Sequence, residues 1–194
     1  MKIYDISRRI SEETAVWPGD VPFSWRETDG ADGAPFGSTC FTMSSHCGTH
    51  ADAPSHVLQD GSAIGEAPLA AYVGPARVVE LPGPGEVGAD ALPRRAIGSP
   101  RVLFRSGGKA SLSPLAAIRL ADGGAMLVGT DAASIDPEDA DDLPAHRALL
   151  ERGVALLEDL DLGGVPEGEY QLVALPLRFE SLDASPVRAI LIKA

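Results

Sequence analysis

Three of the four histidines in this chain lie within eleven consecutive residues, HCGTHADAPSH, at positions 46–56. His46, His50, Asp52 and His56 all occupy even positions. An extended segment would project them from one side, with neighbouring even positions about 6.6 Å apart. Imidazole and carboxylate groups are ligands that suit zinc, and also manganese or iron, whereas an all-oxygen set would indicate magnesium or calcium. The segment is therefore predicted to bind a transition metal.

The backbone of this segment is expected to be a curled, extended loop. A helix would also bring His46 and His50 together, one turn apart, but Gly48 and Pro54 disfavour helical backbone. Gly48 would let the chain bend close to an ion, and Pro54 would fix the approach of His56. For each of these two residues, an ordinary role in forming a loop explains its presence as well as a role in a metal site does, so neither one by itself indicates a site.

The alternative for the cluster is that its histidines are surface or core residues with ordinary hydrogen bonds. That interpretation does not account for three of them in eleven positions. A structural zinc site would more often use closed sets of cysteines. The cluster is thus expected to be catalytic. The remaining histidine, His146, precedes Glu158 by twelve positions, and spacing alone favours a surface histidine and a solvated glutamate for that pair.

Elements that could position these residues follow from apolar runs and turn signals. Helices are expected at 113–124, where Ser113 and Pro114 form a typical helix start, and at 143–153, which ends on Gly153. Short strands are expected at 2–7, 38–46, 76–81, 101–106, 125–131, 170–177 and 187–192. Many short strands with few helices predict an α+β domain built around a sheet, with loops carrying the chemistry.

Length and composition narrow the class of protein further. The 194 residues show no repeat or linker and fit a single domain over 1–194. A formal charge of −12 disfavours nucleic acid and anionic membranes as partners. The amino terminus has no apolar signal region, so a cytoplasmic protein is expected. Cys40 and Cys47 are too few and too close for a disulfide framework and are expected to be reduced thiols.

On these residues the sequence resembles the bacterial-type kynurenine formamidases (arylformamidases) of the metal-dependent cyclase family. The family pattern HxGTHxDxPxH is met in full at positions 46–56. Four further stretches resemble the formamidase branch: VWPGD at 16–20, GTDAASID at 129–136, HRALLERGVALLEDLDL at 146–162 and YQLVALPLRFESLDASPVRAIL at 170–191. The implied fold is a cyclase-like β/β/α domain, which agrees with the strand-rich prediction, and the implied assembly is a homodimer or higher homo-oligomer.

The resemblance also implies a metal centre with two zinc ions, with manganese as an alternative. His46, His50 and Asp52 match the ligands of a first ion, and Asp52 is placed to serve both ions. His146 and Glu158 match ligands of the second ion, which replaces the surface interpretation of that pair.

Other residues take roles from the same resemblance. His56 matches the general acid/base, and Trp17 matches an aromatic residue that packs against the substrate ring. On its own, Trp17 would be a partly buried turn aromatic. Ser44, Ser45 and Cys47 are not expected to act as nucleophiles. The implied substrate is an amide of an aniline-type nitrogen, which leaves readily, so its hydrolysis needs no covalent acyl-enzyme.

The implied reaction is hydrolysis of N-formylkynurenine to kynurenine and formate, a step of tryptophan catabolism, by zinc-activated hydroxide. The implied partner is therefore a small-molecule substrate. Two alternatives to this function stay open. One is a hydrolase of the same family that acts on another small or cyclic amide such as isatin, with one manganese ion in place of two zinc ions. The other is a non-catalytic metal-binding protein that retains the fold.

Overall fold

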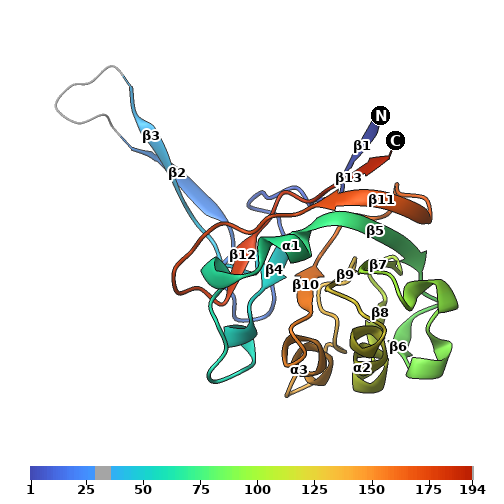
Figure 1. Ribbon diagram of the computed structural model, residues 1–194. Coiled ribbons are helices and arrows are strands. Elements are labelled where there is room, and N and C mark those ends of the chain that lie inside the picture. The colour runs from blue at the N-terminus through green and yellow to red at the C-terminus, as the bar shows by residue number, and fades with distance from the viewer. Residues whose placement is uncertain (29–35, 194) are drawn as a thin grey trace.

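A curled mixed β-sheet forms the centre of the structure, a computed structural model that describes residues 1–28 and 36–193 (Figure 1). The structure confirms the expected α+β fold class, because strands predominate and helices are few. Within the described residues the largest sheet has nine strands, in the order β1 (Lys2–Asp5), β13 (Ile190–Lys193), β11 (Gly168–Val173), β5 (Val73–Glu80), β7 (Arg101–Arg105), β9 (Leu127–Thr130), β10 (Ala155–Glu158), β4 (His50–Asp52) and β12 (Ala184–Pro186).

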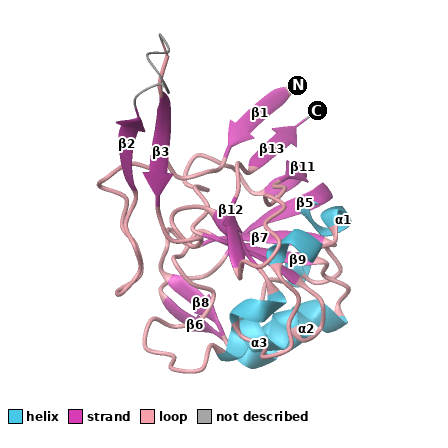
Figure 2. Ribbon diagram, turned by 90° about the vertical axis from the view of Figure 1, so that its left-hand side faces the viewer, coloured by secondary structure: helices cyan, strands magenta, loops and turns pink. Residues whose placement is uncertain are grey.

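Strand direction divides this sheet. β5, β7, β9 and β10 run parallel to one another, whereas every other neighbouring pair is antiparallel. Two helices, α2 (Pro114–Asp122) and α3 (Pro144–Leu150), pack on each other and cover one face of the parallel strands (Figures 1 and 2). α2 begins as its sequence predicts, because the Ser113 hydroxyl accepts a hydrogen bond from the Ala116 N–H at 3.2 Å and Pro114 follows the cap.

Two hydrophobic cores lie on opposite faces of the sheet. The helix side buries Val128 and Leu156 against Leu120 of α2 and Leu149 of α3. On the other side the antiparallel strands curl around a second core, which includes Leu127, Leu157, Leu172, Leu191 and the side chain of Tyr72. Leu156 and Leu157 therefore belong to different cores, as the two-residue period of a strand requires.

Smaller elements complete the fold. β2 (Ser24–Thr28) and β3 (Ser38–Thr42) pair as a hairpin that projects from the body of the molecule (Figure 1). β6 (Gly85–Val87) pairs with β8 (Ala110–Leu112), and the short helix α1 (Leu69–Tyr72) leads into β5. Single 3₁₀ turns lie at Pro54–His56, Ile64–Glu66, Ala89–Ala91 and Arg94–Ala96. No helix among the described residues has the length and apolar content that crossing a membrane requires.

The expected elements all have counterparts in the structure, but their ends differ. The strand expected at 38–46 stops at Thr42, and the strand expected at 170–177 stops at Val173, three residues before Pro176. The helix expected at 143–153 ends at Leu150. The extended loop expected at 46–56 is extended only over His50–Asp52, with turns on both sides.

Candidate metal centre and active site

Strand register brings three of the predicted site residues to one face of the sheet. His50 and Asp52 are two positions apart on β4, so their side chains share a face. β10 pairs antiparallel with β4, with Glu158 opposite His50 and Leu156 opposite Asp52. Since Leu156 belongs to the core beneath the helices, His50, Asp52 and Glu158 also point to the helix side, where all three are almost fully buried.

Helix α3 adds the fourth residue to this group. The Asp136 carboxylate accepts hydrogen bonds from the backbone N–H groups of Ala145 and His146, at 2.7 and 3.0 Å, and thus caps the start of the helix. The same carboxylate lies 2.6 Å from His146 Nδ1 and fixes the ring. His146 Nε2 then lies 3.2 Å from Glu158 Oε1 and 3.4 Å from Asp52 Oδ2.

His46 lies near the other carboxylate oxygen of Asp52. Its Nδ1 lies 3.1 Å from Asp52 Oδ1, and His50 Nε2 lies 3.3 Å from the same oxygen. The His50 ring is held from behind, because its Nδ1 donates to the Gly48 carbonyl at 2.8 Å. Gly48 has a φ of 70°, a conformation that glycine adopts without strain, and the turn aims its carbonyl at the ring.

Asp52 therefore joins two groups of ligand-type side chains. In the first, one ligand atom each from His46, His50 and Asp52 lie within 4.8 Å of one another; in the second, the same holds for Asp52, His146 and Glu158. The structure thus brings together all five residues that the motif and the family resemblance assigned to the metal centre. A third group of this kind contains His46, His56 and Asp183.

The polar atoms at the centre of the cluster suit a cation better than they suit one another. Among the described residues, His50 Nε2 and both carboxylate oxygens of Asp52 are buried without a hydrogen bond of acceptable geometry, although histidine nitrogens lie close by. Leaving buried polar atoms unpaired is unfavourable. A bound metal ion would pair all three atoms, so the residues present fit such an ion.

Charges around the cluster shift the pKa values of its members. Burial alone would lower the pKa of His50, but the neighbouring charges of Asp52 and Glu158 outweigh burial and raise it to about 9. The pKa of His146 is raised in the same way, chiefly by the charge of Glu158 and the hydrogen bond to Asp136, against the effect of burial. Without a metal ion, protons therefore balance the buried carboxylates, and a metal ion would displace them.

A cavity of about 670 Å³ opens onto this cluster. Its wall includes His50, His146 and Glu158, together with His56 and Trp17. The volume lies within the range of small-molecule sites. His56 and Trp17, the predicted acid/base and ring-packing residues, are thus placed at the same cavity as the ligand cluster.

The three excluded nucleophiles lie outside this lining. Cys47 is fully buried, and burial is the main cause that raises the pKa of its thiol, which keeps it protonated. The Ser44 hydroxyl donates to Asp20 at 3.1 Å, and the Ser45 hydroxyl donates to Asp183 at 3.0 Å. These side chains support the loops around the site.

Sequence reasoning missed two carboxylates of this region. Asp136 orients His146, and Asp183 lies 3.1 Å from His46 Nε2 and 3.3 Å from His56 Nδ1. Both belong to stretches that carried the family resemblance, GTDAASID and SLDASP. Their spacing from the histidine motif gave no reason to single them out.

The strand-rich fold, the buried His/Asp/Glu cluster at a small-molecule cavity and the hydrolases to which the chain is similar together define the class: the protein is a metal-dependent hydrolase. The Cyclase family model matches residues 4–137, and the chain belongs to this family. Kynurenine formamidase of Salinibacter ruber (strain DSM 13855 / M31) is 42% identical, covering 98% of this chain and 97% of its own. Kynurenine formamidase of Paracidovorax citrulli (strain AAC00-1) is 42% identical, covering 97% of this chain and 95% of its own.

Solved structures agree with this assignment. A potential metal-dependent hydrolase with cyclase activity superposes with a TM-score of 0.84 and 29% identity, covering 98% of this chain and 96% of the other. A "predicted metal-dependent hydrolase" from Bacillus stearothermophilus gives a TM-score of 0.82 and 29% identity, covering 98% and 97%. Isatin hydrolase A from Labrenzia aggregata gives a TM-score of 0.82 at 24% identity, covering 100% and 94%, and shares the fold.

Proposed function

We propose that the protein is a kynurenine formamidase, which hydrolyses N-formylkynurenine to kynurenine and formate in tryptophan catabolism. The observation that carries this proposal is the arrangement at the cavity, where four of the five ligand-type side chains line the wall together with His56 and Trp17, and the buried Asp52 joins them. The 42% identity to kynurenine formamidases over nearly the whole chain supports the choice of substrate. The alternative of a non-catalytic metal-binding protein has less support, because His56 is retained at the cavity.

The proposed metal centre holds two zinc ions. His46, His50 and Asp52 would bind one ion, and Asp52, His146 and Glu158 would bind the other. A bound zinc pair supplies Lewis-acid activation of a carbonyl and lowers the pKa of water from 15.7 to roughly 7. Imidazole and carboxylate ligands also accept manganese, so elemental analysis decides the metal.

The chain's own residues position the substrate and move a proton. Trp17, on the cavity wall, packs against the aromatic ring. Water adds to the formyl carbon and gives a proton to His56. His56 then delivers that proton to the aryl nitrogen as the bond between the nitrogen and the formyl carbon breaks, so that the amine leaves uncharged and the formyl group leaves as formate. An aniline-type nitrogen is a good leaving group, and the reaction needs no covalent acyl-enzyme.

The test is hydrolysis by the purified protein, with metal content measured on the same sample. N-Formylkynurenine and isatin are assayed side by side, first as purified and then after chelation and reloading with zinc or manganese. Faster turnover of N-formylkynurenine, lost on chelation and recovered on reloading, supports the proposal. Faster turnover of isatin would assign the protein to the isatin-hydrolysing alternative, and inactivity of loaded protein on both would favour the non-catalytic one.

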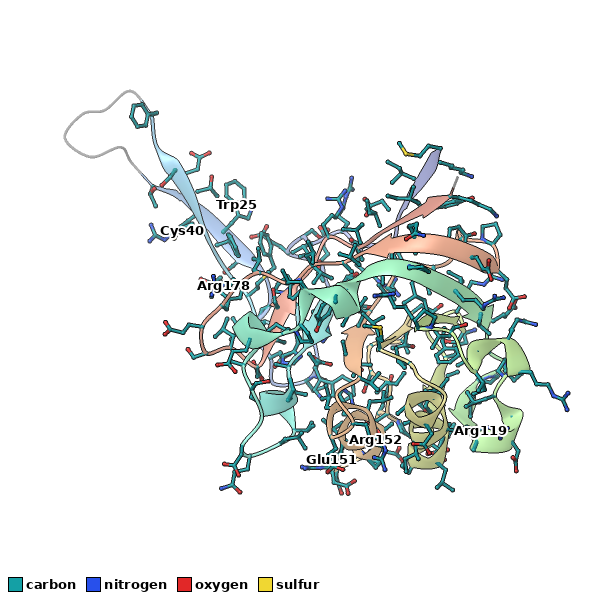
Figure 3. All side chains as sticks on the ribbon, in the orientation of Figure 1. Trp25, Cys40, Arg119, Glu151, Arg152 and Arg178 are labelled. Atoms are coloured by element: carbon teal, nitrogen blue, oxygen red, sulfur yellow. The ribbon has the colours of Figure 1, made fainter. Side chains whose placement is uncertain are left out.

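We also propose that two copies of the chain pair as a homodimer. Trp25 and Phe41 are cross-strand partners, so they share one face of the projecting hairpin, and they are 50% and 61% exposed. Figure 3 shows Trp25 on this hairpin. The sheet half formed by β1, β13, β11 and β5 has an outer face that α2 and α3 leave uncovered (Figure 1). That face carries aliphatic side chains that are only partly buried or exposed: Ile3, Val73, Val173, Ile190 and Ile192.

A second copy accounts for both surfaces at once. A two-stranded hairpin whose side chains face water is marginally stable by itself. Each copy carries one aromatic hairpin and one apolar sheet face, so a twofold arrangement buries both kinds of surface in every protomer.

A further inference from the structure

Asp183 contacts two histidines that have different proposed roles. One oxygen, Oδ2, lies 3.1 Å from His46 Nε2 and 3.3 Å from His56 Nδ1. The other oxygen, Oδ1, accepts a hydrogen bond from the Ser45 hydroxyl at 3.0 Å. The Asp183 carbonyl accepts the Ala53 N–H at 2.8 Å, which fixes the backbone of this loop beside the motif. A single carboxylate is therefore shared by a metal-ligand histidine and the proton-transfer histidine.

This contact determines which nitrogen of each ring carries hydrogen. A carboxylate only accepts hydrogen bonds, so His46 donates through Nε2–H and His56 donates through Nδ1–H. The lone pair of neutral His46 is then on Nδ1, the atom that lies 3.1 Å from Asp52 Oδ1 in the candidate metal site. The lone pair of neutral His56 is on Nε2, which leaves that atom free for proton transfer.

The other two ligand histidines show the same principle with separate partners. His50 donates to the Gly48 carbonyl, and His146 donates to Asp136. Such outer partners fix ring orientation and tautomer in metal sites. Each of those partners serves one ring, whereas Asp183 serves two.

The contacts of the Asp183 carboxylate are to Ser45, His46 and His56, so its effect on the site is exerted through the two histidine rings. We propose that Asp183 is a positioning residue that couples the two rings: it aims His46 Nδ1 at the metal and His56 Nε2 at the reacting nitrogen. The part of this inference that concerns His56 rests on the proposed hydrolysis. The part that concerns His46 rests on the ligand cluster alone.

The test compares Asp183→Ala with Glu180→Gln. Glu180 lies three residues earlier in the same loop, is exposed, and forms no hydrogen bond or ion pair within the described part of the chain. Its substitution removes one negative charge at a similar place without touching a histidine. Asp183→Glu is the rescue variant, because it restores the carboxylate one methylene further out.

Three measurements are made on each protein. Histidine ¹⁵N–¹H correlation spectra of the metal-free protein report the tautomer of His56, competition with a chromogenic chelator reports zinc affinity, and steady-state kinetics of zinc-saturated enzyme separate kcat from KM. For Asp183→Ala we expect His56 to shift from the Nδ1–H to the Nε2–H tautomer that free histidine prefers. We expect zinc affinity and kcat each to fall about 10- to 100-fold with little change in KM.

Each result decides between the alternatives. The inference stands if Asp183→Ala shows these losses, Asp183→Glu recovers part of them, and Glu180→Gln matches the unsubstituted protein. It fails if Asp183→Ala keeps the Nδ1–H tautomer and its zinc affinity, or if Glu180→Gln shows equal losses. Should Asp183→Ala not fold, Asp183→Asn takes its place, because it keeps the size of the side chain and removes the negative charge. An unchanged His56 tautomer and unchanged zinc affinity in Asp183→Asn would overturn the inference. Inactivity of the unsubstituted protein would reject the proposed reaction. The His56 tautomer and the zinc affinity would still test the positioning role of Asp183.

Discussion

His50 and His56 belong to one sequence motif, but their removal is expected to have different effects. His50 is buried beside Asp52 at the candidate metal site, so His50→Ala should lose bound metal and, with it, activity. His56→Ala should retain metal and lose about 10²- to 10⁴-fold in kcat, the usual contribution of general acid–base catalysis. Elemental analysis and kcat, measured on the same preparations, check both. Full activity with bound metal in His50→Ala would show that the site is wrongly assigned.

The raised pKa of His50 predicts how pH changes stability. In the metal-free folded chain this pKa is about 9, against an ordinary value of 6.5. Because the folded value is the higher one, the protonated ring contributes stability that is fully present below pH 6.5 and is lost as the pH rises to about 9. A bound metal ion replaces the proton and is held more tightly as pH rises.

Melting temperatures of metal-free and zinc-loaded protein, measured from pH 6.5 to 9, should therefore diverge. The metal-free protein melts at progressively lower temperature than the loaded protein. Metal-free His50→Gln, which has no imidazole to titrate at this position, should lose less melting temperature over this pH range than the metal-free unsubstituted protein. A gap that stays constant or narrows with rising pH would contradict the role given to His50.

At the scale of an element, the turn that precedes β4 needs a left-handed backbone conformation and also positions the His50 ring. Gly48 has a φ of 70°, and a Cβ added there would lie 3.2 Å from Ile10 Cγ1. Gly83 has a similar φ of 65°, but a Cβ there would meet nothing within 4 Å. Gly48→Ala and Gly83→Ala should each lower the free energy of unfolding by about 1–2 kcal/mol, because both place alanine in the left-handed region.

Only Gly48→Ala should also weaken metal binding, because it displaces the carbonyl that holds His50. Urea unfolding and chelator competition on the two variants separate strain from site geometry. Equal metal affinity in both would mean that the His50 ring does not depend on this turn.

The elements of the fold could be predicted where local signals were strong, and the site only in part. α2 follows from a serine cap and a proline, but β4 has three residues and no hydrophobic run, so it becomes a strand only by pairing with β10 and β12. The motif at 46–56 indicated a metal, whereas the inclusion of His146 and Glu158 depended on family resemblance. Asp136 and Asp183 could not be predicted, because their roles arise from hydrogen bonds between segments far apart in sequence.

For the whole molecule, the proposed dimer predicts a response to substitutions in the hairpin. Replacing both Trp25 and Phe41 with serine removes the exposed aromatic face and should shift the protein from dimer to monomer in light scattering coupled to gel filtration. Leu115→Ser is the matched control, because Leu115 is a 67% exposed apolar residue on α2, away from the hairpin. A monomeric unsubstituted protein, or a dimer unaffected by the double substitution, would contradict the proposed interface.

The pairing of His50 with Glu158 across β4 and β10 has a consequence for how the chain reaches its native state. If one strand paired a single residue out of step, its side chains would exchange faces. Ala51 or Leu157, hydrocarbon groups with no affinity for cations, would then occupy the place of a ligand. Metal that stays bound during purification should therefore distinguish molecules in which these two strands are paired in the correct register from misfolded ones.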